Sequence, residues 1–393
     1  MELLVLITVL VVIVAIAKVM RSHELSTQLA DDEEYVSLSE IKTQGFLYAL
    51  FGVLLFGGLI AQMAGWGKFL LPVSASEHGD KIDNLFWVTM YLILFVFFLT
   101  HTFLFAFIFK YYKKKDQKAL WFPHNNKLEM AWTIIPAIVL LSLISYGLTT
   151  WDSVINVEED KSAIEVELVG EQFKWSAHYS GKDNQLGQVN FSAITSSNSL
   201  GILTKATLDS ALAGTLASIK QLEGQVKQLD SLVENGWSGK CEELSEAETQ
   251  LSAWKANERR LKKMIAENGN YSVANDDIII RDTLFLCKGK SHHFTFRSKD
   301  IIHSAYFPHF RAQMNCVPGM KTQFTFTPRY TAEEMKEEAA KEGKTFYAYE
   351  LVCNKICGAS HYKMRFPIVV LEQKDFDAKM KAAKTFGDEI AGN

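Results

Sequence analysis

Cys353-Asn-Lys-Ile-Cys357-Gly-Ala-Ser-His361-Tyr-Lys-Met364 is the most informative segment of this chain. Two thiols, an imidazole and a thioether fall within twelve residues, at spacings of four, four and three. Apolar, strand-like runs flank it at 346–352 and 366–371. The spacings would also suit one face of a helix. Gly358 and the β-branched flanks instead predict a loop between two strands.

The same side chains are typical ligands of a soft metal ion. Thiolate and thioether sulfurs, together with imidazole, suit copper far better than magnesium or calcium. Zinc would accept the two cysteines and a histidine, but it rarely binds a thioether. A blue-copper site needs only one cysteine, so the second cysteine here would allow two thiolates to bridge two metals. The residues predict a redox copper site, with a disulfide or a zinc loop as the alternatives.

A histidine earlier in the chain extends the pattern. His303 lies in Asp300-Ile-Ile-His303-Ser, after the alternating run 294–297, and Val317-Pro318-Gly319-Met320 forms a turn soon after. With these segments the chain resembles subunit II of the haem–copper oxidases, the cytochrome c oxidase subunit that carries the dinuclear CuA centre. That family shows D-(V/I)-(L/I)-H-S, a P-G turn and C-x-E-x-C-G-x-x-H-x-x-M. Five side chains match its ligand positions: His303, Cys353, Cys357, His361 and Met364.

The resemblance implies a β-barrel of the cupredoxin type in which Cys353 and Cys357 bridge two copper ions. Two histidines, a methionine and one backbone carbonyl complete the implied ligand set: His303, His361, Met364 and the carbonyl of Lys355. In the family, a glutamate at the position of Lys355 helps to hold a magnesium ion at the boundary with the catalytic subunit. A charged lysine cannot take that role, which argues against a magnesium site.

An aromatic segment also resembles the family. Gly170-Glu-Gln-Phe173-Lys-Trp175 looks like G-x-Q-W-x-W-x-Y, whose first tryptophan receives the electron from cytochrome c. Phe173 stands at that position and Trp175 follows, so both are candidates for accepting the electron. An aromatic strand in a β core would explain either residue equally well.

Residues 1–150 predict a transmembrane module. Four apolar runs are long enough to span a bilayer, at about 3–20, 46–64, 85–109 and 130–148. Six lysines between the third and fourth runs place that loop in the cytoplasm, so the chain after residue 150 lies outside. Ala15-Ile-Ala17 resembles a signal-peptide cleavage site. The lack of Lys or Arg ahead of the first run, and the topology, favour an uncleaved span.

The last two spans match the two of the family, and packing against other membrane subunits is the interpretation for the additional first two. His101 lies within the third span, where an interhelical hydrogen bond is favoured over a functional role. Glu129-Met-Ala-Trp132-Thr-Ile-Ile-Pro136 precedes the fourth and resembles the family's E-x-x-W-T-x-x-P. The resemblance makes Glu129 a candidate for proton uptake toward the catalytic subunit, with helix capping as the alternative.

Residues 151–393 predict an all-β extramembrane domain. Residues 163–169 alternate like a strand with one buried face. Further strand patterns lie at 277–281, 283–287, 293–296 and 321–327, and 375–384 is helix-prone. Within the domain, 204–267 carries two heptad series joined by a Gly-containing turn, which predicts an inserted antiparallel helical hairpin. A docking arm and a passive decoration are equally compatible with it.

Composition and cysteine content limit the classes of function that are possible. A net charge of −4 gives no sign of nucleic-acid binding. No Cys-x-x-Cys-His follows the copper motif, so the electron donor must be a separate protein. Three further cysteines, Cys241, Cys287 and Cys316, allow one disulfide and one free thiol, or three buried thiols.

Together these features predict the electron-accepting subunit of a proton-pumping, oxygen-reducing cytochrome c oxidase in a bacterial inner membrane. A cytochrome c, or a membrane-held cytochrome c domain, would reduce a periplasmic copper pair, which would pass electrons to haem in subunit I. The alternative from another class is a copper-free structural subunit of a quinol oxidase. A stand-alone copper carrier is disfavoured by the four spans, and a nitrous-oxide-reducing enzyme by the lack of room for a second catalytic domain.

Overall fold

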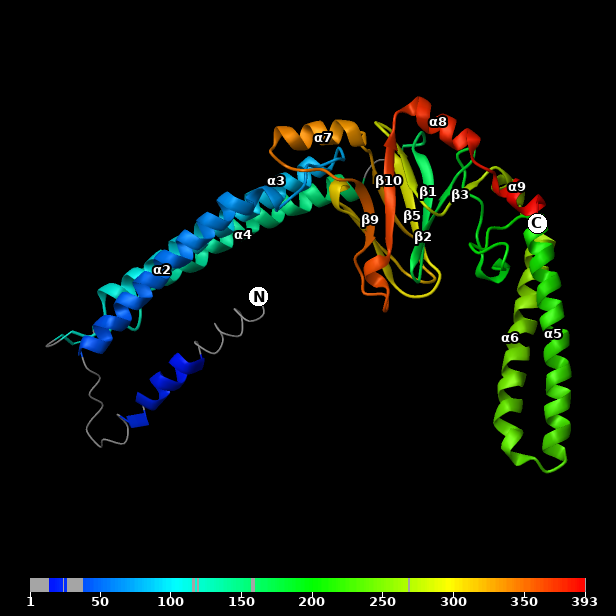
Figure 1. Cartoon of the computed structure of the whole chain (residues 1–393), viewed down its shortest axis with the longest axis horizontal. Helices are drawn as coiled ribbons and strands as arrows, with labels where there is room; N and C mark the ends of the chain where they lie inside the picture. The colour runs from blue at the N-terminus through cyan, green and yellow to red at the C-terminus, as the bar shows by residue number, and fades with distance from the viewer. Residues whose placement is uncertain are drawn as a thin grey trace. The chain divides into compact units, whose positions relative to one another are not determined.

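The computed structural model describes residues 14–23, 25–26, 38–114, 117–118, 120–156, 160–267 and 269–392 (Figure 1). The chain forms two compact units. One comprises Met1–Gly67 with Val88–Leu141, and the other Lys68–Trp87 with Ser142–Asn393. The first is helical, and the second holds the β-strands and the helical hairpin.

Three described helices are long and apolar enough to cross a membrane: α2 (Leu38–Trp66), α3 (Gly79–Lys110) and α4 (Asn126–Ile155). They contain the predicted second, third and fourth spans. The predicted first span, at about 3–20, lies largely outside the described residues. An aromatic contact joins α2 to α3, since the Phe56 and Phe98 ring centroids are 5.0 Å apart. A Cβ at Gly52 would lie 2.7 Å from the Phe105 ring, so glycine permits this close approach.

Within the described residues, His101 in α3 is bonded inside its own helix rather than between helices, which differs from the sequence-based expectation. Its Nδ1 lies 2.9 Å from the carbonyl oxygen of Phe97, one turn back in the same helix. Its ring also lies 4.2 Å from the Phe97 ring, centroid to centroid. The histidine is satisfied locally, because the helix itself offers an acceptor one turn away.

Two five-stranded sheets form the β-domain, in the orders β3-β2-β1-β5-β8 and β4-β10-β9-β6-β7. Their strands are β1 (Ile164–Glu171), β2 (Lys174–Tyr179), β3 (Ile278–Ile280), β4 (Leu284–Cys287), β5 (His292–Ser298), β6 (His303–Phe307), β7 (Ala312–Cys316), β8 (Thr322–Phe326), β9 (Tyr349–Cys353) and β10 (Arg365–Leu371). β1 runs parallel to β5, and β10 runs parallel to β4. Aromatic side chains such as Phe294 and Phe307 fill the shared core. The predicted all-β, cupredoxin-like domain is confirmed.

Strand β1 is buried on both faces, so the prediction of one buried face was wrong. Val166 and Leu168 point into the main core. Val169 packs in a second cluster with Leu200 and Phe386, on the opposite face of the sheet. The segment leading into the hairpin and the C-terminal helix α9 (Phe386–Ala391) supply this cover.

The predicted helical hairpin is confirmed. Helices α5 (Lys205–Glu234) and α6 (Cys241–Glu267) run antiparallel (Figure 1). The seam buries Leu208, Ile219 and Leu222 of α5 together with Ala247 and Leu261 of α6. Thr215, which interrupts the heptads, is buried too, and its Oγ1 accepts a hydrogen bond from Asn257 Nδ2 at 3.2 Å.

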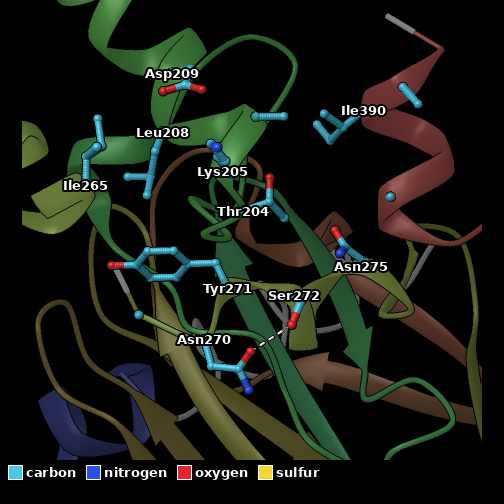
Figure 2. Close-up of a pocket in the computed structure, with 14 residues that line it drawn as sticks. Thr204, Lys205, Leu208, Asp209, Ile265, Asn270, Tyr271, Ser272, Asn275 and Ile390 are labelled. Carbon is cyan, nitrogen blue, oxygen red and sulfur yellow. Dashed lines mark hydrogen bonds between the residues drawn. The ribbon is translucent and has the colours of Figure 1, made fainter. Parts of the chain in front are cut away.

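A pocket lies at the root of this hairpin, between the start of α5, the 269–275 segment and α9 (Figure 2). The Tyr271 hydroxyl donates to the Met264 carbonyl at 3.0 Å, and the Ser272 hydroxyl donates to Asn270 Oδ1 at 2.7 Å. None of its lining residues is a cysteine or a histidine. The pocket is therefore separate from the predicted metal ligands.

Short helices complete the fold. The C-terminal helix expected at 375–384 is α8 (Gln373–Ala382), whereas α7 (Ala332–Lys341) was not predicted. Its start carries a capping box, because Thr331 and Glu334 bond each other's backbone N–H groups. The 3-10 helices are η1 (Gly67–Phe69), η2 (Phe191–Ala193), η3 (Ser238–Lys240), η4 (Tyr271–Asn275), η5 (Pro308–Phe310) and η6 (His361–Lys363).

The segment that leads into α3 is fastened to the β-domain. The Ala75 N–H donates to the His309 carbonyl at 2.7 Å, and Ser76 forms an isolated bridge with Pro328. The Arg311 guanidinium donates to both carboxylate oxygens of Asp83, at 2.6 and 2.9 Å. This bidentate pair ties the first turns of α3 to the turn before β7.

Candidate metal centre

The predicted ligands lie at one end of the β-domain. His303 begins β6 and Cys353 ends β9, and these adjacent antiparallel strands place Ala305 opposite Cys353. The loop from β9 to β10, which we call the metal loop, carries Cys357 and ends with the short helix η6, which begins at His361. The expected loop between two strands is therefore present.

The other four predicted ligand groups lie around the two cysteine sulfurs. Cys353 Sγ lies 3.9 Å from Cys357 Sγ, 3.9 Å from His303 Nδ1 and 3.2 Å from the Lys355 carbonyl oxygen. Cys357 Sγ lies 3.4 Å from His361 Nδ1 and 3.8 Å from Met364 Sδ. Each sulfur thus has its own histidine, and the remaining two donors divide between them.

Within the described residues, His303, Cys353 and Cys357 form a compact group of potential metal ligands, with donor atoms all within 4.8 Å of one another. The donor set of thiols, imidazoles, thioether and carbonyl fits copper, since its sulfur atoms are soft. Two thiols 3.9 Å apart are also close enough to share metal ions between them.

A second shell holds His303 in place. The His303 side chain is 0% exposed, and its Nε2 lies 2.8 Å from Asp300 Oδ1. Asp300 also accepts from the N–H groups of Gln172 and Ile301, at 2.6 and 2.7 Å. With Nε2 committed to this carboxylate, Nδ1 is left to face the sulfurs, as a metal-binding histidine requires. The sequence motif contained Asp300, but this role was not predicted.

The two aromatic candidates for electron acceptance occupy different positions. Trp175 is only 1% exposed; its Nε1 donates to the Met364 carbonyl at 3.4 Å, and its ring lies 6.0 Å from that of His303. Phe173 is half-buried and packs against the metal loop at Gly358. Trp175 therefore forms the floor of the site, whereas Phe173 lies at its rim.

The thiols are free, so the alternative of a disulfide in the metal loop is not found. Burial raises the pKa of Cys357 to about 11, and the neighbouring Cys353 adds to the effect. Cys287 and Cys316 are buried, whereas Cys241 is exposed. Neither arrangement expected for these three residues, a disulfide or three buried thiols, is therefore present.

Glu129 caps helix α4. Its Oε1 accepts from the Asn125 N–H at 3.1 Å, while Asn125 Oδ1 accepts from the Leu128 N–H at 3.1 Å. This reciprocal arrangement satisfies backbone donors at the helix start. The capping interpretation has direct structural support, and a part in proton uptake stays a prediction.

A buried charge network on the outer face of β1 was not predicted from the sequence. His178 lies with Nδ1 3.1 Å from Glu167 Oε2 and Nε2 2.6 Å from Asp277 Oδ2. Arg297 donates twice to Glu167, at 3.0 Å each. Burial alone would lower the pKa of His178, but the hydrogen bonds to Asp277 and Glu167 raise it to about 9. These groups lie apart from the metal ligands. They link strands β1, β2 and β5 on the covered face of the sheet.

Comparison with known proteins fits this architecture. Residues 64–149, which include α3 and most of α4, match the transmembrane domain of cytochrome c oxidase subunit II. The chain is 26% identical to the alternative cytochrome c oxidase subunit 2 of Bradyrhizobium diazoefficiens, over 78% of this chain and 80% of that one. It is 22% identical to cytochrome c oxidase subunit 2 of Thermostichus vulcanus, over 81% and 80%. Over most of its length the chain is therefore similar to subunit II of cytochrome c oxidases.

This similarity, together with the three helices long and apolar enough to span a membrane, supports a membrane-bound part of an oxidoreductase complex. Among solved structures, the periplasmic domain of subunit II of cytochrome oxidase from Bradyrhizobium japonicum matches with a TM-score of 0.27 and 13% identity, over 57% of this chain and 95% of that one. That likeness is too weak to carry an argument. The family match covers α3 and α4, so α2 lies almost entirely ahead of it.

Proposed function

We propose that this chain is the electron-accepting subunit of a bacterial cytochrome c oxidase. It would take electrons from a cytochrome c, or from a membrane-held cytochrome c domain, and pass them to haem in subunit I, where oxygen is reduced and protons are pumped. The observation that supports this most directly is the ligand cluster: two thiols 3.9 Å apart, each with its own histidine.

The residues would hold two copper ions in a pre-arranged site. Cys353 and Cys357 offer the bridging thiolates, and His303 is oriented by Asp300 before any metal arrives. Met364 and Trp175 are both about 1% exposed, so the inner side of the cluster excludes water. When bound, the copper pair would supply reversible one-electron storage. A rigid ligand set that excludes water would keep the positions of the ligand side chains similar in both redox states.

The proposed function also assigns a role to each domain. We assign 1–150 to the transmembrane module and 151–393 to a periplasmic CuA domain that contains the 204–267 insertion. The lysines between α3 and α4 support a cytoplasmic position for that loop, and we assign the chain to a bacterial inner membrane. Phe173, at the rim of the site, is the better placed of the two aromatic candidates to accept electrons. Glu129 remains a candidate for proton uptake, and Lys355 argues against a bound magnesium ion.

The test is copper loading of the full-length chain purified in detergent. Copper per chain, the EPR spectrum and the visible spectrum of the oxidised form are recorded. Two coppers with a mixed-valence signal, lost in Cys353→Ser and retained in Cys287→Ser, are expected. Cys287 is the matched control, because it is buried but lies outside the cluster.

Two other results would reject the proposal. One copper with a blue-type signal would mean that the second thiol is not a bridge. A chain that takes up no copper would instead be a structural subunit, as in a copper-free quinol oxidase.

A further inference from the structure

Four loops meet at the end of the β-domain that carries the metal ligands: 171–174, 298–303, 316–322 and 353–365. Strand register places them together, since Gly170 pairs with Ser298 and His303 pairs with Cys316. A bridge between Ser298 and Pro318 joins two of the loops directly. We call this surface the metal end.

The metal end is basic on a chain that is acidic overall. Its four loops carry six basic and two acidic side chains, a net charge of +4, whereas the whole chain has −4. The basic residues are Lys174, Lys299, Lys321, Lys355, Lys363 and Arg365, and the acidic ones are Glu171 and Asp300.

Both acidic groups are already engaged within the protein. Glu171 pairs with Lys174 at 3.1 Å and also with Lys299. Asp300 faces His303 and accepts two backbone N–H groups. Their negative charge is therefore compensated locally.

Two lysines remain available to an external donor. Lys321 and Lys363 are exposed and make no ion pair within the described part of the chain, whereas Lys355 stands at a position that faces the catalytic subunit in the family. The Lys363 ammonium lies only against its neighbour, 5.5 Å from the centre of the Tyr362 ring. The surface thus presents positive charge to whatever docks on it.

Apolar side chains lie among these lysines. Ile356 is 87% exposed and Tyr362 is 69% exposed, and Ile301, Ile302 and Met320 are exposed as well. An apolar patch with a charged rim is typical of a protein–protein contact. Ile356 and Tyr362 are immediate neighbours of the ligands Cys357 and His361, so a protein seated here would approach the ligand cluster closely.

We propose that the metal end docks an acidic electron donor, a c-type cytochrome whose haem edge is surrounded by carboxylates. This rests on the proposed function, since only an electron-accepting subunit needs such a donor. Opposite charges steer encounter and set orientation, whereas a lysine-rimmed cytochrome would meet like charge. The lysines supply the steering, and the apolar patch supplies the contact.

The test uses the metal-free, full-length chain in detergent and two soluble monohaem cytochromes c, one with an acidic and one with a basic haem-edge surface. Binding is measured by calorimetry at low ionic strength. The acidic cytochrome should bind at least about tenfold more tightly, and added salt should weaken it by screening. The double variant Lys321→Glu with Lys363→Glu should lose this preference. Lys182→Glu with Lys227→Glu changes net charge equally at exposed sites away from the metal end and should retain it.

Two results would overturn the proposal. The basic cytochrome could bind more tightly than the acidic one. Alternatively, the charge-reversed variant could bind the acidic cytochrome as well as before, which would mean that these lysines face something other than the donor. Copper uptake is not measured here, so failure of the copper proposal would be seen separately.

Discussion

A Cβ atom on Gly358 would lie 2.9 Å from Cζ of the Phe173 ring. Gly358 also has a φ of +127°, a conformation that residues with a side chain rarely adopt. The side chain of Gln172 adds a further link, because its Nε2 donates to the Cys357 carbonyl at 2.7 Å. The aromatic segment and the metal loop therefore fix each other's positions, and only glycine fits between them.

Replacing Gly358 by alanine should distort the metal loop. We expect a loss of stability of about 1–3 kcal/mol from the strained backbone and a marked loss of copper affinity. Thermal unfolding and a copper-chelator competition would measure the two effects. Gly289→Ala is the control: its φ is +69°, yet no atom lies within 4 Å of the added Cβ. It should lower stability without weakening copper binding, and equal copper affinities in the two variants would refute the argument.

Asp300→Asn should weaken copper binding by about 10- to 100-fold, because it replaces the carboxylate that orients His303. The N–H groups of Gln172 and Ile301 donate to different oxygens of Asp300, and the amide has only one acceptor oxygen, so one of these two bonds is kept and a modest loss of stability should accompany the change. Copper affinity is measured by chelator competition, and thermal unfolding of the metal-free chain is the control. Unchanged copper affinity would show that the fold alone positions His303.

Sequence predicted the metal loop well, because its ligands are local and their types dictate the chemistry. His303 lies fifty residues earlier than Cys353, and it was found through a family pattern rather than through physics. The transmembrane helices were predictable from long continuous apolar runs. The hairpin was predictable because its apolar periodicity repeats over many turns. The sequence also contains a local signal for helix α7, the capping box formed by Thr331 and Glu334.

The buried network could not be read in this way. Glu167 alternates with apolar residues in β1, which is the pattern of a residue that faces solvent. It is buried because Leu200 and Phe386, which are distant in sequence, cover that face of the sheet. Its partners His178 and Arg297 come from other strands. Nothing in the local sequence encodes such a pairing.

The Glu167–His178 pair predicts a pH range of greatest stability. Burial would raise the pKa of Glu167, but the hydrogen bond from His178 and the charge of Arg297 lower it from 4.5 to about 2. Its contribution is present above pH 4.5 and is lost as pH falls toward 2. The pKa of His178 rises from 6.5 to about 9, so its contribution is present below pH 6.5 and is lost as pH rises toward 9.

Thermal unfolding of the full chain across this range should therefore show a plateau for these two groups between pH 4.5 and 6.5. Glu167→Gln should cost about 3–5 kcal/mol there, since it leaves buried cations without their partner. Glu223→Gln removes an exposed ion pair with Lys255 and should cost at most about 1 kcal/mol. Similar costs for the two variants would contradict the network's role.

The link between Asp83 and Arg311 should matter more than the neighbouring link between Asp80 and Arg329. The Arg311 side chain is only 7% exposed, and both of its bonds to Asp83 are charge-assisted, whereas Asp80 is largely exposed. Asp83→Asn should therefore destabilise the β-domain by about 2 kcal/mol, and Asp80→Asn by less than about 1 kcal/mol. Urea unfolding of the full chain, followed by tryptophan fluorescence, measures both. If the exposed pair proved as costly to break as the buried one, the start of α3 would be held to the β-domain by backbone contacts such as Ala75 to His309 instead.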